Sequence, residues 1–165
     1  PMVRKQITVP LLAAGGIATG DGMMAVMALG ADGVQIGSRF VASKESSAHD
    51  AFKKAVVLAK EGDTQLTLKE LAPVRLLKNK FYQDLQALYK TAPTAEALKN
   101  MLGRARAKRG MFEGDLEEGE LEIGQISGLI DEIASVSDIV DSIINEFKAC
   151  QTRLATITLN YQNDQ

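Results

Sequence analysis

Two glycine-containing turns carry the clearest chemical signal in this sequence. Gly15 and Gly16 end one apolar run, and Gly37 with Ser38 ends a second, 21 residues after Gly16. A glycine backbone can approach an anion closely because no Cβ stands in the way. Amides that open a short helix after Gly37 would point at the same anion. The pattern predicts a phosphate site shared by the two turns; two ligand-free strand-to-helix turns are the alternative.

The elements that must position these turns form one βαβ unit. We expect strands at 7–14 and 33–36, joined by a helix at 21–29. Both strands are almost continuously apolar, which is typical of parallel strands that are covered on both faces. A phosphate site at two adjacent strand ends, with a small extra helix, is the arrangement of the last two strands of a (β/α)8 barrel. The predicted fold class is therefore α/β.

Two strands alone do not make a stable sheet. The chain also begins at Pro1, without an initiator methionine. We therefore expect it to be the C-terminal part of a larger protein. The expected organisation is two βα units at 1–60, a helical segment at 61–122, a glycine-bracketed loop with the final helix at 123–155, and a frayed tail at 156–165.

Few other residues offer chemistry. His49 is the single histidine and lies beside an expected helix start, so a structural or capping role is favoured over proton transfer. Cys150 falls on the apolar face of the last helix, where an inert buried thiol is expected. No histidine and cysteine cluster supports a metal site. The sequence identifies no catalytic residue in this chain.

A basic run at 104–109 is followed by a run of acidic residues at 113–122. Opposite charges on either side of a turn favour mutual neutralisation. A nucleic-acid surface is the alternative, but no aromatic residues alternate with the arginines. We therefore expect solvated ion pairs here.

Composition excludes several classes of protein. With 165 residues, 45% hydrophobic and 24% charged, the chain has the size and character of one globular domain. A net charge of -2 gives no reason to expect nucleic acid or an anionic membrane as a partner. No apolar stretch reaches the roughly 20 residues that span a bilayer. A single cysteine and no visible signal peptide favour a cytoplasmic setting.

Three segments closely resemble the nitronate monooxygenase family, formerly called 2-nitropropane dioxygenase. They are 9–20, which ends with the first glycine turn, 28–40, which contains the second, and 45–49. The resemblance continues through 75–81 and 124–130 into the last helix. The flavin-dependent enoyl-acyl-carrier-protein reductases share these motifs, so the resemblance is more specific for the superfamily than for the activity.

This resemblance implies an FMN-binding (β/α)8 TIM barrel, of which the chain supplies the last two strands and helices, followed by a mostly helical C-terminal extension. It implies that FMN is bound by Gly15, Gly16, Gly37, Ser38, Gln125 and Ser127. The family's catalytic histidine falls earlier in the barrel, so His49 does not inherit that role.

The activity implied for the full-length enzyme is oxidation of an alkyl nitronate with O2, and a homo-oligomer is compatible with it. NAD(P)H-dependent enoyl reduction is the alternative within the same class, and a non-catalytic phosphate-binding or assembly fragment is the alternative outside it. The fragment alone is expected to be inactive.

Overall fold

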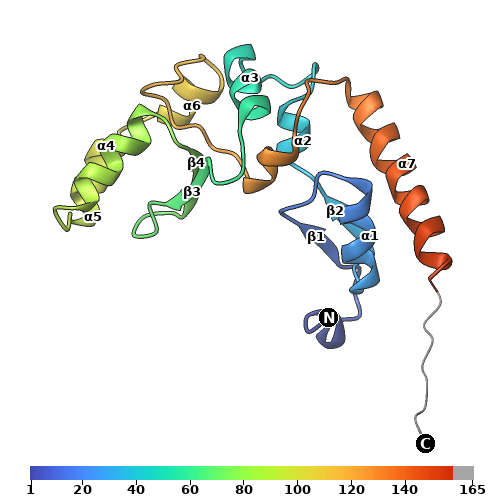
Figure 1. The fold of residues 1–165 in the computed structure, drawn as a ribbon. Helices are drawn as coiled ribbons and strands as arrows, with labels where there is room; N and C mark the ends of the chain where they lie inside the picture. The colour runs from blue at the N-terminus through green and yellow to red at the C-terminus, as the bar shows by residue number, and fades with distance from the viewer. Residues whose placement is uncertain (158–165) are drawn as a thin grey trace, which may run out of the picture.

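The expected βαβ unit is present in the computed structural model, which describes residues 1–157. Strands β1 (Leu12–Ala14) and β2 (Gly33–Gln35) pair in parallel, and helix α1 (Gly20–Ala28) connects them (Figure 1). The Thr19 hydroxyl caps α1 by accepting a hydrogen bond from the Gly22 N–H at 3.1 Å. The pairing brings the carboxyl ends of both strands to one edge.

Strand β1 begins at Leu12, later than the sequence predicts. The 3-10 helix η1 (Arg4–Gln6) comes before it. One carboxylate oxygen of Asp32 accepts from the Arg4 guanidinium and from the Leu11 N–H, both at 2.8 Å. The Asp32 backbone N–H also donates to Leu11 O at 2.7 Å, so the side chain and the backbone of Asp32 together satisfy the residue just before β1.

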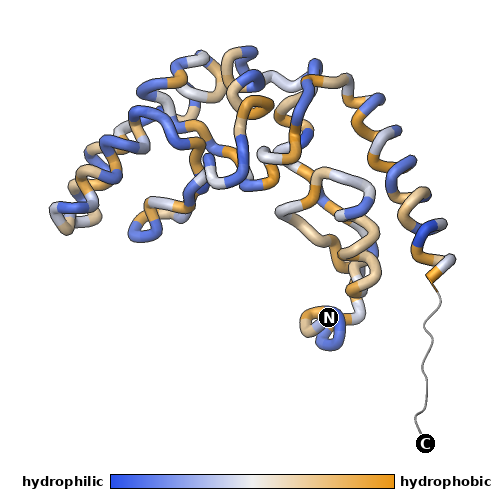
Figure 2. The backbone as a smooth tube through the Cα atoms, viewed as in Figure 1, coloured by the Kyte–Doolittle hydropathy of each residue, from blue (hydrophilic) through white to orange (hydrophobic). Residues whose placement is uncertain are grey.

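The final helix, α7 (Val136–Ala155), lies alongside α1 (Figure 1). Contact is close because Gly20 has no side chain: a Cβ there would collide with the backbone of Ile143 and Phe147. The Gly20 N–H also donates to Glu146 Oε2 at 2.7 Å. Figure 2 shows apolar and polar stretches alternating along α7, as expected for a helix with one buried face.

Short helices occupy the middle of the arch that the chain forms in Figure 1. They are α2 (Ser38–Val41), α3 (Asp50–Leu58) and the 3-10 helix η2 (Gln125–Leu129), and η2 contacts both of the others. A core beneath them consists of apolar side chains: Ala42, Phe52, Val56, Ala59, Leu77, Leu121, Ile123 and Ile130. This core fixes η2 relative to the end of β2.

The segment expected to be helical at 61–122 begins with an antiparallel hairpin instead. Its strands are β3 (Thr64–Thr67) and β4 (Val74–Leu77). Residues 120–123 extend along β4: the Leu77 N–H donates to Leu121 O at 3.0 Å, and the Ile123 N–H donates to Arg75 O at 3.1 Å. The hairpin therefore gains a third extended partner from a distant part of the chain.

Three helices follow the hairpin. They are α4 (Lys80–Tyr89), α5 (Ala95–Leu102) and α6 (Arg106–Met111). Leu68, Leu76, Phe81, Leu85 and Leu98 form the core between the hairpin, α4 and α5. Within residues 1–157 no helix has both the length and the apolar character needed to cross a bilayer. Most of the tail expected to fray, 158–165, lies outside the described residues.

Candidate functional site

The two glycine turns lie at one edge of the β1–β2 pair. Gly15 and Gly16 follow β1 with φ values of 91° and 69°, which favour glycine. Gly37 follows β2 and precedes α2. An ideal Cβ on any of these three glycines would meet no atom within 4 Å beyond its chain neighbours. The backbone at both turns therefore borders open space.

Ser38 ties the second turn to a distant loop. Its Oγ accepts a hydrogen bond from the Gly124 N–H at 3.1 Å. A Cβ on Gly124 would lie only 2.7 Å from that oxygen, so this approach needs glycine. Gly37, Ser38 and Gly124 line a cavity of about 420 Å³ together with residues of the β3–β4 hairpin. We call this cavity the Ser38 cavity.

The loop after Gly124 folds into η2 and brings in the remaining predicted residues. Gln125 lines a second cavity, of about 260 Å³, together with Gly16. Ser127 is fully buried, and its Oγ has no hydrogen-bond partner among residues 1–157. A buried hydroxyl without a partner is uncommon and costs free energy.

The six predicted residues thus fall into four positions. Gly16 and Gln125 share one cavity, and Gly37 and Ser38 share the other. Gly15 belongs to the first turn but lines neither cavity, and Ser127 is buried in η2. Backbone amides at open glycine turns are donors that suit a phosphate. The residues present therefore fit the phosphate end of a flavin nucleotide.

A family model described as nitronate monooxygenase matches residues 1–146. The chain belongs to the nitronate monooxygenase family.

Curated relatives agree with this assignment. The chain is 30% identical over 154 residues to a probable nitronate monooxygenase of Staphylococcus saprophyticus, a match that covers 93% of this chain and 43% of the relative. It is 32% identical over 148 residues to a probable nitronate monooxygenase of Bacillus subtilis, covering 88% of this chain and 42% of the relative. The chain therefore spans less than half the length of these relatives.

Solved structures show the same likeness. FabK from Thermotoga maritima is 40% identical with a TM-score of 0.83, and the match covers 93% of this chain and 49% of that one. Nitroalkane oxidase from Streptomyces ansochromogenes is 32% identical with a TM-score of 0.71, and the match covers 92% of this chain and 43% of that one. The mixed α/β fold of this nitronate monooxygenase family member is thus shared with longer chains.

His49 is a helix cap in this family member. The ring Nδ1 accepts a hydrogen bond from the Ala51 N–H at 3.1 Å at the start of α3. The backbone N–H of His49 donates to Met111 O at 2.8 Å. The ring also packs on Gly114, where a Cβ would collide with it. The structure confirms the capping role that the sequence favours for His49.

Replacing His49 with glutamine is expected to lower the free energy of unfolding by about 1 kcal/mol, the usual value of a lost N-cap. His49→Asn is the matched control, because asparagine is a good N-cap and would restore most of that stability. Chemical denaturation of both variants measures the effect. Equal losses in the two variants would contradict the capping role.

The sequence did not single out three residues that line the two cavities. Arg75 and Glu122 line the Ser38 cavity, and Glu61 lines the cavity that contains Gly16. The Arg75 guanidinium is held by Thr64, with its Nη1 3.1 Å from the Thr64 hydroxyl and 3.3 Å from its carbonyl. Arg75 belongs to the 75–81 segment of the family resemblance, which was the one available signal.

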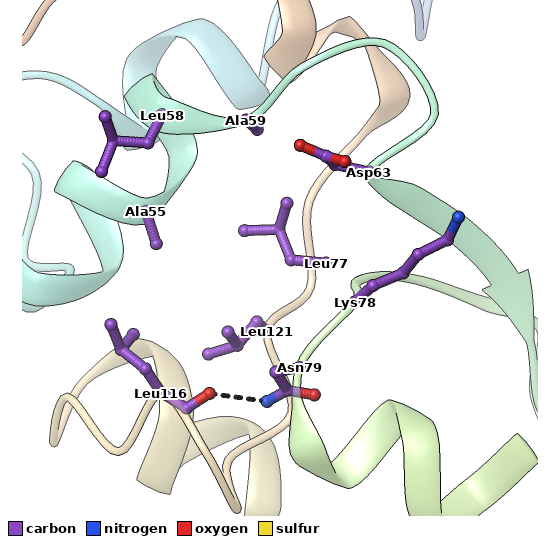
Figure 3. Close-up of a pocket in the computed structure, with 9 residues that line it drawn as sticks. All are labelled: Ala55, Leu58, Ala59, Asp63, Leu77, Lys78, Asn79, Leu116 and Leu121. Atoms are coloured by element: carbon purple, nitrogen blue, oxygen red, sulfur yellow. Dashed lines mark hydrogen bonds between the residues drawn. The ribbon is translucent and has the colours of Figure 1, made fainter.

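A further cavity, of about 390 Å³, contains none of the predicted site residues. Figure 3 shows Leu77 and Leu121 at its centre, with Asp63 and Lys78 toward one side. Asn79 is fully engaged there: its Nδ2 donates to Leu116 O at 2.9 Å and Gly119 O at 2.8 Å, and its Oδ1 caps α4. These bonds give Asn79 a structural role.

Residues 1–157 contain no group of three or more histidine, cysteine, aspartate or glutamate side chains placed to hold an ion. The lone thiol, Cys150, is buried, and burial raises its pKa. A raised thiol pKa disfavours the reactive thiolate.

Proposed function

We propose that this chain is the phosphate-binding part of an FMN-dependent oxidoreductase of nitronate monooxygenase type. In this proposal β1 and β2 are the last two strands of a (β/α)8 barrel, and α7 is its closing helix. The observation that carries it is the open edge where both glycine turns end. Family membership supports the activity class.

Each predicted residue has a distinct task in this proposal. Gly15 and Gly16 let the phosphate approach the backbone after β1, and the amides at Gly37 and Ser38 donate to it. Gln125 offers an amide side chain next to Gly16, and Ser127 offers a hydroxyl. FMN would supply the electron chemistry, while these residues bind and orient it.

The proposed substrate is an alkyl nitronate with O2 as the oxidant. NAD(P)H-dependent enoyl reduction is the second candidate, because the glycine-turn motifs also resemble the flavin-dependent enoyl-acyl-carrier-protein reductases. The two activities differ in their electron donor. We expect the full-length protein to be yellow and to consume oxygen when an alkyl nitronate is added.

The decisive assay compares that oxygen consumption with NAD(P)H oxidation, measured with and without an enoyl thioester. Enoyl-dependent NAD(P)H oxidation without nitronate turnover would favour the second candidate. A colourless preparation that binds no added FMN would favour a non-catalytic module. Under the leading proposal the 165-residue chain alone does not turn over nitronates, and its measurable turnover would contradict the expectation that the catalytic group lies outside this chain.

Replacing Ser38 with alanine is expected to weaken FMN binding by about 1 kcal/mol, or about fivefold, the net value of one hydrogen bond. The hydroxyl holds the Gly124 loop, but backbone amides would still contact the phosphate. Flavin fluorescence titration of the full-length protein measures this, with exposed Ser47→Ala as the control. A loss of a hundredfold or more would mean that the hydroxyl dominates phosphate binding.

A further inference from the structure

Another cavity, which shares a wall with the Ser38 cavity, is lined by two carboxylates. Its volume is about 300 Å³, and Pro73, Val74 and Glu122 line both cavities. Its apolar wall includes Leu68 and Leu71 from the hairpin loop and Leu102 from α5. The remaining lining residues are Ala72 and Glu120. We call it the Glu120 cavity.

Both carboxylates face this cavity because residues 120–123 are extended along β4. Alternate side chains of an extended segment point to opposite faces. Leu121 and Ile123 are buried in the core beneath α3, while Glu120 and Glu122 line the cavity on the other face. The position of Glu120 is thus fixed by two neighbours packed on the opposite side.

Glu120 is only 7% exposed. Its carboxylate has neither a hydrogen bond nor an ion pair with any group in residues 1–157. The nearby Arg106 is engaged elsewhere: its guanidinium donates to Leu102 O at 2.8 Å, to Glu118 O at 2.6 Å and to Met101 O at 3.0 Å. A buried carboxylate without a direct partner is costly; within residues 1–157 only the nearby charge of Arg106, which forms no hydrogen bond or ion pair with it, favours its ionised form.

We propose that the Glu120 cavity binds a primary alkylammonium group, with the ammonium donating to Glu120 and Glu122 and the alkyl stem lying against Leu68, Leu71 and Leu102. An ammonium supplies three hydrogen-bond donors and the missing positive charge. A stem of a few carbons matches the apolar wall. A volume near the lower limit for ligand pockets suits a small ligand.

The test uses three probes on the 165-residue chain at pH 8: hexylammonium chloride, hexan-1-ol and ammonium chloride. Calorimetry measures affinity, and methyl NMR of the leucines locates binding. Hexylammonium is expected to bind at least about tenfold more tightly than hexan-1-ol or ammonium, because it alone of the three combines a positive charge with an alkyl stem. Methyl signals of Leu68, Leu71 and Leu102 should shift. Equal binding of hexanol would overturn the proposal, and so would no binding of hexylammonium.

Glu120→Gln tests the charge directly. This variant is expected to weaken hexylammonium binding at least about tenfold. Exposed Glu117→Gln is the matched control and should leave binding unchanged. Glu122→Gln provides a second variant in the same cavity and should also weaken binding. Unchanged affinity in both cavity variants, each shown to be folded by circular dichroism, would overturn the proposal.

Discussion

Replacing Gly37 with valine is expected to remove FMN from the full-length protein while leaving the protein folded. Gly37 has an ordinary φ of -106°, and a Cβ there meets nothing within 4 Å, so valine adds no clash within the described chain. Its branched side chain would fill the space next to the proposed phosphate amides. Losing two hydrogen bonds to a charged group, at about 1.5–3 kcal/mol each, weakens binding at least about a hundredfold.

Flavin absorbance per protein and the melting temperature together measure this effect. Ala25→Val, on the exposed face of α1, is the matched control for a β-branched residue and should keep its flavin. Gly16→Val is a poorer test, because its φ of 69° would strain any side chain. If Gly37→Val keeps flavin at the wild-type ratio, the phosphate assignment to this turn is wrong.

The glycine turns could be predicted because their signals are local. An apolar run that stops at Gly15 and Gly16, and a second that stops at Gly37, show where parallel strands end. Backbone angles at the first turn need glycine, and that need is visible in the sequence. The Thr19 and Ser135 caps are also local, since each accepts a hydrogen bond from a residue three positions later.

The β3–β4 hairpin could not be predicted because its stability comes from distant residues. Each strand is four residues long, and the pattern of β3 does not alternate cleanly. Residues 120–123 complete the arrangement by bonding to β4, more than 40 positions along the chain. The same long-range pairing creates the Ser38 and Glu120 cavities, so their hairpin residues were missed as well.

The charged run at 104–122 contains ion pairs that the sequence predicts and one buried carboxylate that it does not. Lys108 pairs with Glu113 at 3.0 Å, and Arg109 pairs with Asp115 at 2.6 Å, which confirms the predicted neutralisation across a turn. Glu120 departs from that pattern because strand-like pairing carries it beneath the hairpin loop. Burial of a single carboxylate within an acidic run leaves no trace in composition or spacing.

Replacing Glu120 with glutamine is expected to stabilise the chain above neutral pH. Burial, with a smaller contribution from the charge of Glu122, raises the pKa of Glu120 from 4.5 to about 7. The folded state therefore binds more protons than the unfolded state between these values, so the wild-type free energy of unfolding falls as the pH rises through this window. Fully ionised, the group costs about 3 kcal/mol. Glutamine has no charge to bury and avoids that cost.

Urea denaturation of the wild type and of Glu120→Gln at several pH values from 4 to 9 measures this effect. The two proteins should have similar stability below about pH 4.5 and should diverge progressively until about pH 8. Exposed Glu117→Gln should show no such divergence, which separates burial from a general loss of negative charge. A difference that does not change with pH would contradict the raised pKa. A Glu120→Gln variant less stable than the wild type at high pH would show that the ionised carboxylate has a stabilising partner.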